Sequence, residues 1–327
     1  MKISVYIPSY NQKGYLIEAI ESVLAQTLRP FEIIIVDDCS SDGSQQVIAA
    51  YAARYPDLVI PVYHVHNQGI ALTRNDALQR VGGDYVTYVD GDDRFLPTKL
   101  EKERRLLQNN PGAEIAFSNI YYMTAEGIRT GLWADAEKPP QGDVFSKVFA
   151  RDFPRQSLFR NDLVNYQAWK GIGFYDPELR IWEDDDMRLR LTKKLKAVYH
   201  DEPLAEYRIH DKGLSRAGIG HHLKALRYVY EKNLLLLDDV EVTERWRAQC
   251  GFIGYMAQHA ERAANQLLME DSYQFEERRQ LLSFYLWHRR CRPFILGRSF
   301  VLKALLPGRV YWKLWSARRR LSAQLQH

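Results

Sequence analysis

The sequence predicts an α/β protein in which a mostly parallel central sheet is flanked by helices, with a helical C-terminal extension. Two observations lead to this class. Segments with the pattern of strands alternate with segments of helical pattern over the first hundred residues, and the pattern is helical from about residue 221 onward. Strands that alternate with helices across short connections form parallel sheets with right-handed crossovers, a layout common in nucleotide-binding proteins.

The individual elements follow from apolar periodicity and from the turn residues between segments. The helical pattern after residue 221 presents one apolar face, which carries Leu223, Leu226, Val229, Tyr230 and Leu234. The expected strands cover residues 3–7, 31–36, 59–64, 84–89 and the apolar run 114–123, and the expected helices cover residues 14–26, 44–55, 69–81, 99–108 and 185–194.

The length of 327 residues exceeds one typical domain. We expect an α/β domain over residues 1–217, divisible near residue 96, and an appended helical, basic region over residues 218–327. The three cysteines are far apart and odd in number, which indicates the cytoplasm rather than a disulfide framework. Neither a signal peptide nor a run of about eighteen uncharged apolar residues is present, so we expect no membrane-spanning helix.

Charge is distributed unevenly along the chain. Residues 278–327 contain twelve Lys or Arg and no Asp or Glu, so the preceding part is acidic, with 33 basic and 41 acidic residues. An acidic main domain argues against nucleic-acid binding. Between residues 284 and 320, large apolar residues interleave with the basic ones, which suits peripheral contact with an anionic membrane at its cytoplasmic face. The alternative is a helical cap on the main domain or on a second copy in a homo-oligomer.

A group of carboxylates closes the expected strand 84–89. Asp90 and Asp92 are two residues apart, so both can point into the crevice beyond the carboxyl ends of the strands. Adjacent carboxylates repel each other unless a cation lies between them. A hard ion such as Mg²⁺ or Mn²⁺ accepts few carboxylates and completes its shell with water and phosphate oxygens. The pair therefore predicts a metal-bridged diphosphate, and the alternative is a solvated acidic turn.

Three other polar segments follow expected strands at the same edge of the sheet. They are Pro8-Ser9-Tyr10-Asn11, the run 37–43 that begins Asp37-Asp38-Cys39-Ser40, and the run 67–75 that contains Gly69 and Arg74. Taken singly, such segments can be turns or helix caps. Their order along the chain indicates a common site.

In these segments the chain resembles the family 2 glycosyltransferases of GT-A fold, over residues 1 to about 217. Members transfer a sugar from a nucleotide-sugar donor to an acceptor. The resemblance implies that residues 1–96 bind the donor and residues 97–217 the acceptor. It places Tyr10, with Pro8 and Asn11, against the nucleobase, and it places Asp38 on an imide nitrogen of the base, which favours uracil.

The resemblance also assigns roles to the other segments. It implies that Gly69 and Arg74 meet the nucleotide and that Asp90-Gly91-Asp92 is the family's D-x-D motif. Asp92 is then the first metal ligand, with Asp90 nearer the ribose or the metal's waters. His210 lies in a segment like the one that closes the family's domain, whose histidine often reaches the metal or diphosphate. The alternative for His210 is an ordinary loop histidine.

The run 183–186 resembles the family's E-D pair at the start of a helix. Asp184 then falls at the catalytic base, which removes a proton from the acceptor hydroxyl in a single inverting displacement. An aromatic residue often follows the pair in the family, whereas Asp185 and Asp186 follow it here, so the base could be one position away. The alternative is an acidic run that complements the helix dipole.

Together these features predict a metal-dependent, inverting glycosyltransferase. We expect it to use Mn²⁺ or Mg²⁺ and to move a sugar from a UDP-sugar to a hydroxyl of a glycan or lipid-linked acceptor in bacterial surface polysaccharide synthesis. A sugar-phosphate nucleotidylyltransferase would need a Gly-rich basic N-terminal loop, which Pro8-Ser9-Tyr10-Asn11 is not. A non-catalytic nucleotide-sugar-binding protein would not need the run 183–186. Dinucleotide-binding and P-loop motifs do not occur.

Overall fold

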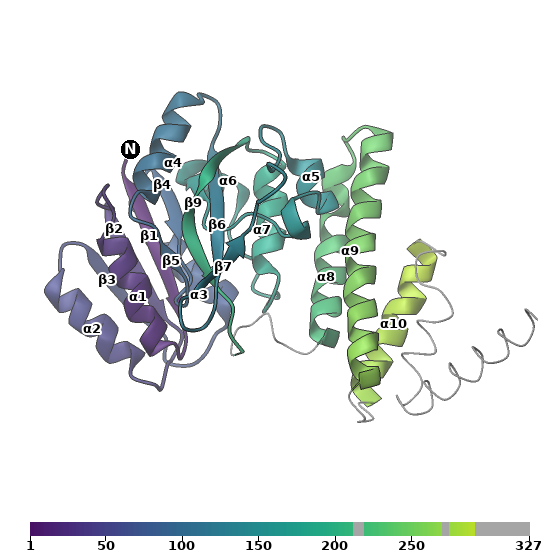
Figure 1. The fold of residues 1–327 in the computed structure, drawn as a ribbon, viewed down its shortest axis with the longest axis horizontal. Coiled ribbons are helices and arrows are strands. Elements are labelled where there is room, and N and C mark those ends of the chain that lie inside the picture. The colour runs from purple at the N-terminus through teal and green to yellow at the C-terminus, as the bar shows by residue number, and fades with distance from the viewer. Residues whose placement is uncertain (212–218, 270–274, 292–327) are drawn as a thin grey trace, which may run out of the picture. The chain divides into compact units, whose positions relative to one another are not determined.

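In a computed structural model of the chain, residues 1–211, 219–269 and 275–291 are described. The chain divides into two compact units, Met1–Gly213 and Leu214–His327. Among the described residues, the first unit holds the sheet and the second holds helices alone (Figure 1). The boundary predicted between residues 217 and 218 falls outside the described residues.

A nine-stranded sheet forms the centre of the first unit, with the strand order β3-β2-β1-β4-β8-β6-β9-β5 and β7 paired to β6. The first four strands in sequence are parallel, because β1 pairs in parallel with β2 and β4, and β2 with β3. The strands are β1 Ile3–Ser9, β2 Glu32–Asp37, β3 Val59–Tyr63, β4 Tyr85–Tyr88, β5 Arg94–Phe95, β6 Ile115–Met123, β7 Arg129–Leu132, β8 Leu163–Asn165 and β9 Ala197–Arg208.

The second half of the sheet has mixed strand directions. β8 is antiparallel to both β4 and β6, and β5 is antiparallel to β9, whereas β6 and β9 are parallel. The expectation of parallel strands is therefore confirmed for β1 to β4 but does not hold throughout. The short strands β5, β7 and β8 contain two, four and three residues, too few for a periodic pattern to reveal them.

The described part of the first unit contains seven α-helices beside the sheet. Strand β2 is buried along its whole length. Ile33, Ile34, Ile35 and Val36 are fully buried, which is typical of a parallel strand covered on both faces. α1 and α3 both pack on β1. The helices are α1 Lys13–Leu24, α2 Ser44–Arg54, α3 Ile70–Leu78, α4 Lys99–Asn109, α5 Phe145–Ala150, α6 Tyr166–Ile172 and α7 Glu183–Thr192.

The described part of the second unit is helical, as expected from the sequence. Its helices are α8 Ile219–Asn233, α9 Val242–Met269 and α10 Phe275–Cys291. The predicted apolar face of α8 is buried at Leu223, Leu226, Val229 and Tyr230, whereas Leu234 begins the short 3-10 helix Leu234–Leu237 and is partly exposed. No described helix combines the length and hydropathy that a bilayer span requires. Most of the predicted membrane-contact region, 284–320, lies outside the described residues.

Candidate functional site

The carboxyl ends of β1 and β2 bring two of the predicted segments into direct contact. The backbone N–H of Asp38 donates to the carbonyl of Ser9 at 2.9 Å. Asn11 donates from its backbone to Ser40 Oγ, and its side-chain oxygen accepts from the backbone N–H of Ser41, both at 2.8 Å. These bonds hold the Tyr10-Asn11 segment against the turn after β2, at the edge where ligands bind in parallel sheets.

Left-handed backbone conformations occur at this edge, at the start of α7 and within residues 151–161. Asn11, Cys39 and Trp182 have φ of 51°, 65° and 64°, in the left-handed region that non-glycine residues rarely occupy. Each such residue costs of the order of 1–3 kcal/mol, and strain of this kind is commonest at ligand-binding sites. The three positions adjoin the segments predicted to bind the nucleotide and to supply the base.

Asp38 is buried at the end of β2, where it organises the loop after β3. Its carboxylate accepts from the backbone N–H of Gln68 at 2.7 Å and of Gly69 at 2.9 Å, and it lies 2.7 Å from His64 Nδ1. Gly69 has φ +91°, a conformation in which a side chain would be strained. Asp38 therefore shapes the predicted nucleobase pocket through this loop, and its direct contact with the base stays a prediction.

Arg74, on α3, is buried between the two acidic segments of the site. Its Nη2 donates to Asp90 Oδ1 at 2.8 Å, its Nε lies 3.3 Å from Glu183 Oε1, and the guanidinium lies 4.5 Å from the centroid of the Tyr88 ring. In the described part of the chain, Nη1 has no hydrogen-bond partner. A buried donor without a partner is costly, and the Arg74 side chain also interacts with the hydroxyl of Tyr6.

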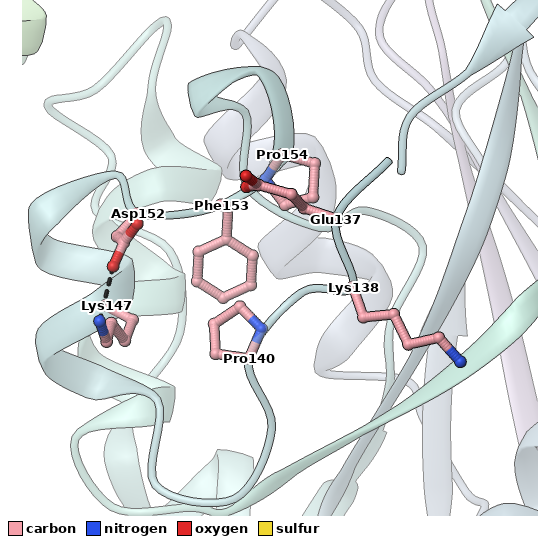
Figure 2. Close-up of a pocket in the computed structure, with 7 residues that line it drawn as sticks. All are labelled: Glu137, Lys138, Pro140, Lys147, Asp152, Phe153 and Pro154. Carbon is pink, nitrogen blue, oxygen red and sulfur yellow. Dashed lines mark hydrogen bonds and ion pairs between the residues drawn. The ribbon is translucent and has the colours of Figure 1, made fainter. Parts of the chain in front are cut away.

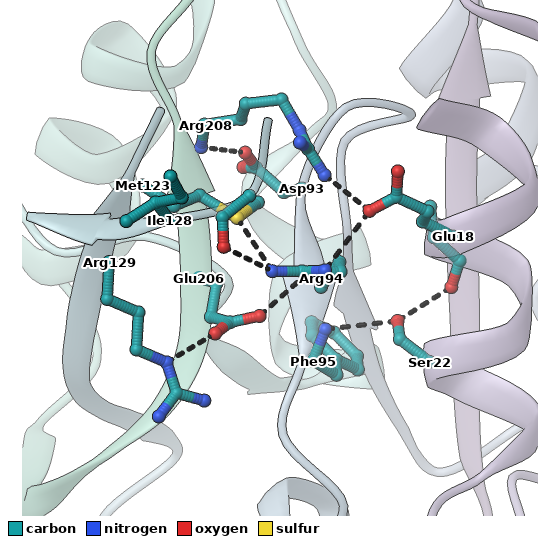
Figure 3. A network of polar contacts seen from close by, with 12 residues as sticks. Glu18, Ser22, Asp93, Arg94, Phe95, Met123, Ile128, Arg129, Glu206 and Arg208 are labelled. Atoms are coloured by element: carbon teal, nitrogen blue, oxygen red, sulfur yellow. Dashed lines mark hydrogen bonds and ion pairs between the residues drawn. The ribbon is translucent and has the colours of Figure 1, made fainter. Parts of the chain in front are cut away.

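Asp92 faces the segment after β1 and the end of β9. Its Oδ2 accepts from Gln12 Nε2 at 2.8 Å and lies 2.9 Å from His210 Nε2. Arg208 on β9 anchors this loop. Its backbone N–H donates to Asp93 Oδ1 at 2.8 Å (Figure 3), and its Nε donates to the carbonyl of Asp92, also at 2.8 Å. Burial, with the charges of Asp92 and Asp90, raises the pKa of Asp93 well above its usual range.

The three predicted metal ligands do not converge on one point. Among residues 1–211, 219–269 and 275–291, no group of three or more His, Cys, Asp or Glu side chains is placed to hold a metal ion. The physical reason is Arg74, which takes Asp90 as its partner. Asp92 and His210 remain as an oxygen and nitrogen pair. Such a pair fits Mg²⁺ or Mn²⁺, because these ions often take one or two protein ligands and complete their shells with phosphate oxygens and waters.

The acidic run at the start of α7 contains one partly exposed carboxylate, Asp184, and three buried ones. Asp185 pairs with Arg151, and Asp186 lies 2.9 Å from Arg190 Nη2; their side chains are 5% and 0% exposed. Asp184 pairs with Arg188 at 2.7 Å, and its side chain is 21% exposed. Of the three aspartates, Asp184 is therefore the most exposed, and its role as base stays a prediction.

Glu183 and Asp184 have opposite electrostatic environments. Burial and the charge of Asp184 raise the pKa of Glu183 to about 8, although Arg74 opposes the shift. Burial also raises the pKa of Asp184, but Arg188, Arg160 and Arg74 outweigh it and hold that pKa below its usual value. Near neutral pH, Asp184 is therefore ionised and Glu183 is largely protonated, and such divergence is typical of acid–base sites.

Three residues of the site were not predicted from the sequence. Arg188 donates to Asp184 and to the hydroxyl of Tyr88 at 2.7 Å each, and its spacing of four residues from Asp184 is a signal that could have found it. Gln12 is adjacent to the Tyr10-Asn11 motif. Arg160 lies 4.3 Å from the centroid of the Tyr207 ring, a contact that no local pattern indicates.

Two shallow cavities occur on the described surface of the first unit. The first has a volume of about 230 Å³ and contains none of the predicted site residues (Figure 2). The second has a volume of about 290 Å³ and lies beside the ends of β6 and β9. Its lining residues are Tyr122, Thr130, Gly131, Arg155 and Ile209.

Comparison with known structures reveals the same fold over nearly the whole chain. The crystal structure of S. aureus TarS 1-349 in complex with UDP-GlcNAc has a TM-score of 0.67 at 17% identity, with 98% of this chain and 92% of that chain covered. The mannosyltransferase PcManGT from Pyrobaculum calidifontis, in complex with GDP-Man and Mn²⁺, has a TM-score of 0.56 at 14% identity, with 94% and 86% covered. At these identities the likeness shows the fold, which is the expected GT-A fold.

Sequence comparison identifies the family. Residues 4–163 match the family model described as Glycosyl transferase family 2. TuaG from Bacillus subtilis (strain 168), named as a teichuronic acid biosynthesis glycosyltransferase, is 31% identical over 214 residues, which cover 65% of this chain and 81% of TuaG. Several other curated relatives are matched over less than half of their own length. The chain belongs to glycosyl transferase family 2.

Proposed function

We propose that this chain is an inverting glycosyltransferase that moves a sugar from a UDP-sugar to a hydroxyl of a glycan or lipid-linked acceptor. The observation that carries the proposal is the position of Arg74. Its guanidinium connects Asp90 of the D-x-D motif with Glu183, the neighbour of the proposed base. The same guanidinium has a buried Nη1 with no partner in the described chain, which suits an oxygen of the donor.

The uridine specificity rests on Asp38 and on the relatives. A carboxylate that accepts from an imide N–H favours uracil, and three hydrogen-bond contacts already fix the orientation of Asp38. TarS has been solved with UDP and with UDP-GlcNAc, whereas PcManGT holds GDP-Man. Relatives of this fold therefore bind different bases, and Asp38 is the residue in this chain that supports uridine.

The proposed reaction needs one carboxylate as base. Asp184 accepts the proton of the acceptor hydroxyl as the new glycosidic bond forms at the anomeric carbon. The nucleotide diphosphate leaves from the opposite face of that carbon. At rest, three arginines hold the pKa of Asp184 low, which makes it a weak base. A diphosphate bound at Arg74 would neutralise one of these cations and so raise the proton affinity of Asp184.

A divalent metal is part of the proposal. Asp92 and His210 would hold Mn²⁺ or Mg²⁺, and the bound ion would supply Lewis-acid stabilisation to the diphosphate. Asp90 would contribute through its ion pair with Arg74 rather than as a direct ligand. PcManGT, solved with Mn²⁺, supports this choice of metal.

The acceptor and the cellular setting follow from the relatives and from the basic region. TuaG is named for teichuronic acid biosynthesis, which supports a role in bacterial surface polysaccharide synthesis. We place the enzyme in the cytoplasm, with peripheral contact at the inner face of the cytoplasmic membrane through residues 284–320.

The test is a titration of UDP-, GDP- and ADP-sugars with and without Mn²⁺, with donor binding and slow donor hydrolysis as readouts. We expect UDP-sugars to bind best and Mn²⁺ to strengthen binding. Arg74→Met should weaken UDP-sugar binding by more than about tenfold, whereas Arg105→Gln, at a side chain that is 70% exposed, should not. Stronger binding of purine nucleotides would exclude the assignment of Asp38, and metal-independent hydrolysis would exclude the metal.

A further inference from the structure

Arg160 is a cation without a partner beside the proposed base. Its guanidinium lies over the ring of Tyr207, 4.3 Å from the centroid, and its charge acts on Asp184 and Asp90. In the described part of the chain it makes no hydrogen bond or ion pair. A partly buried arginine normally pairs with a carboxylate or phosphate, so this one is available for a ligand.

The neighbouring carboxylates do not need the charge of Arg160. Asp90 is paired with Arg74 at 2.8 Å, and Asp184 with Arg188 at 2.7 Å. The positive charge of Arg160 therefore remains for a substrate.

Aromatic and basic residues connect Arg160 with the 290 Å³ cavity. Tyr207 on β9 is the register partner of Tyr122 on β6, and the two rings are nearly perpendicular with centroids 6.0 Å apart. Tyr122 lines the cavity, and the Arg155 guanidinium lies 5.7 Å from the centroid of its ring. We call the series Arg155, Tyr122, Tyr207 and Arg160 the acceptor track.

The conformation at the outer end of the track is strained. Arg155 and Gln156 have φ of 56° and 54°, in the left-handed region. Two successive non-glycine residues in this conformation are strained, and such strain persists only where the surrounding structure holds it. The Arg155 side chain is 49% exposed and lies 2.9 Å from Asp135, which is 60% exposed. Exposed pairs of this kind contribute little to stability, so Arg155 can exchange Asp135 for an anionic ligand at small cost.

We infer that the acceptor track binds the sugar chain of an acceptor that carries carboxylate or phosphate groups. The tyrosine rings offer apolar faces for sugar rings, and the two arginines offer planar forks that match either anion. The ring centroid of Phe159, the neighbour of Arg160 in sequence, lies 5.7 Å from the guanidinium of Arg188, which pairs with Asp184. A chain in the track would therefore bring a hydroxyl toward the base. This inference rests on the proposed function and extends it to the class of acceptor.

Binding to matched saccharides tests the inference. The first pair of probes is tetragalacturonate and its fully methyl-esterified form, which lacks the carboxylate charges, and the second pair is glucose 6-phosphate and glucose. We expect the wild-type protein to bind at least one anionic probe about tenfold more tightly than its neutral counterpart. The pair that shows the larger difference distinguishes carboxylate from phosphate recognition.

Three variants test which residues cause the preference for anionic over neutral probes. Arg160→Gln should reduce it to about twofold or less, while Arg160→Lys, which keeps the charge, should retain part of it. Arg155→Gln, at a side chain that is 49% exposed, should weaken binding of the tetrasaccharide about threefold. Arg105→Gln is the matched control on α4 and should behave as wild type. Circular dichroism and melting curves check that each variant is folded.

The outcomes are separable from those of the proposed function. Equal binding of charged and neutral probes, no binding of any probe, or a full preference in folded Arg160→Gln protein would overturn the acceptor inference. Failure of the proposed function would appear instead as wild-type protein that neither binds nor hydrolyses a UDP-sugar. Donor hydrolysis without an anionic preference would leave the proposed function standing and exclude the acceptor track.

Discussion

His64 Nδ1 lies 2.7 Å from Asp38 Oδ1, and the pair is buried at the end of the parallel half of the sheet. The other ring nitrogen lies 2.9 Å from Asp76 Oδ2. The ring therefore lies between the carboxylate at the end of β2 and a carboxylate of α3. His64 therefore fixes the orientation of Asp38, and through Asp38 it fixes the loop that carries Gly69.

We predict that His64→Gln weakens UDP binding by about tenfold, the equivalent of ~1.4 kcal/mol. The reason is that Asp38 loses the donor that holds it toward the nucleobase pocket, while the backbone bonds from Gln68 and Gly69 remain. Calorimetric titration with UDP measures the change. His66→Gln, at an exposed side chain two residues away, is the control. Unchanged UDP affinity in the His64 variant would refute a positioning role.

The aspartates of α7 should respond differently to amide substitution. Asp184→Asn should lower the rate of sugar transfer by about 10²–10⁴ and leave the protein folded. Asp186→Asn should cost about 3 kcal/mol of stability, because Asp186 is fully buried against Arg190, yet the folded fraction should retain activity. Transfer rates and urea denaturation of both variants separate the two effects. A fully active Asp184→Asn enzyme would show that Asp184 is not the catalytic base.

The buried pair of Lys99 and Glu103 permits a stability prediction. Both side chains are 0% exposed, and Lys99 Nζ also donates to the carbonyl of Asn161 at 2.6 Å. Lys99→Met should lower the free energy of unfolding by about 3–5 kcal/mol, because it leaves the Glu103 carboxyl buried without its partner. The double variant Lys99→Met, Glu103→Leu should recover most of that loss. Urea denaturation measures both, and a double variant no more stable than the single one would contradict the explanation.

His288 should make the helical second unit sensitive to acid. The side chain is buried on α10, and burial lowers its pKa from 6.5. As the pH falls below about 7, the unfolded state binds the proton first, so the unfolding free energy decreases until the lower folded-state pKa is reached. The slope is at most about 1.4 kcal/mol per pH unit.

His288→Met should remove this component of the pH dependence, whereas His221→Gln, at an exposed side chain on α8, should leave it in place. Thermal unfolding followed between pH 5 and pH 8, with probes in the helical unit, is the measurement. Identical pH profiles for the wild-type and His288→Met proteins would show that burial of this histidine does not contribute.

Much of the first half of the fold could be predicted from local sequence. The run Ile33 to Val36 has no polar interruption, which indicates a strand covered on both faces, and turn residues separate it from its neighbouring helices. Because parallel strands end at one edge, the motifs after β1, β2 and β4 had to lie together. The antiparallel strand β8 could not be found in this way, because its three residues depend on β4 and β6 for their pairing.

The sequence by itself determined the family resemblance, the parallel half of the sheet and the acidic run at the start of α7, because each depends on residues that are close together in the sequence. Only the tertiary structure decided which carboxylate is accessible and which cation is left unpaired. Arg188 meets the hydroxyl of Tyr88 across a separation of 100 residues, and Arg160, in the loop before β8, meets Tyr207 of β9. Burial and pairing of a charge depend on groups that folding brings close, so local patterns cannot specify them.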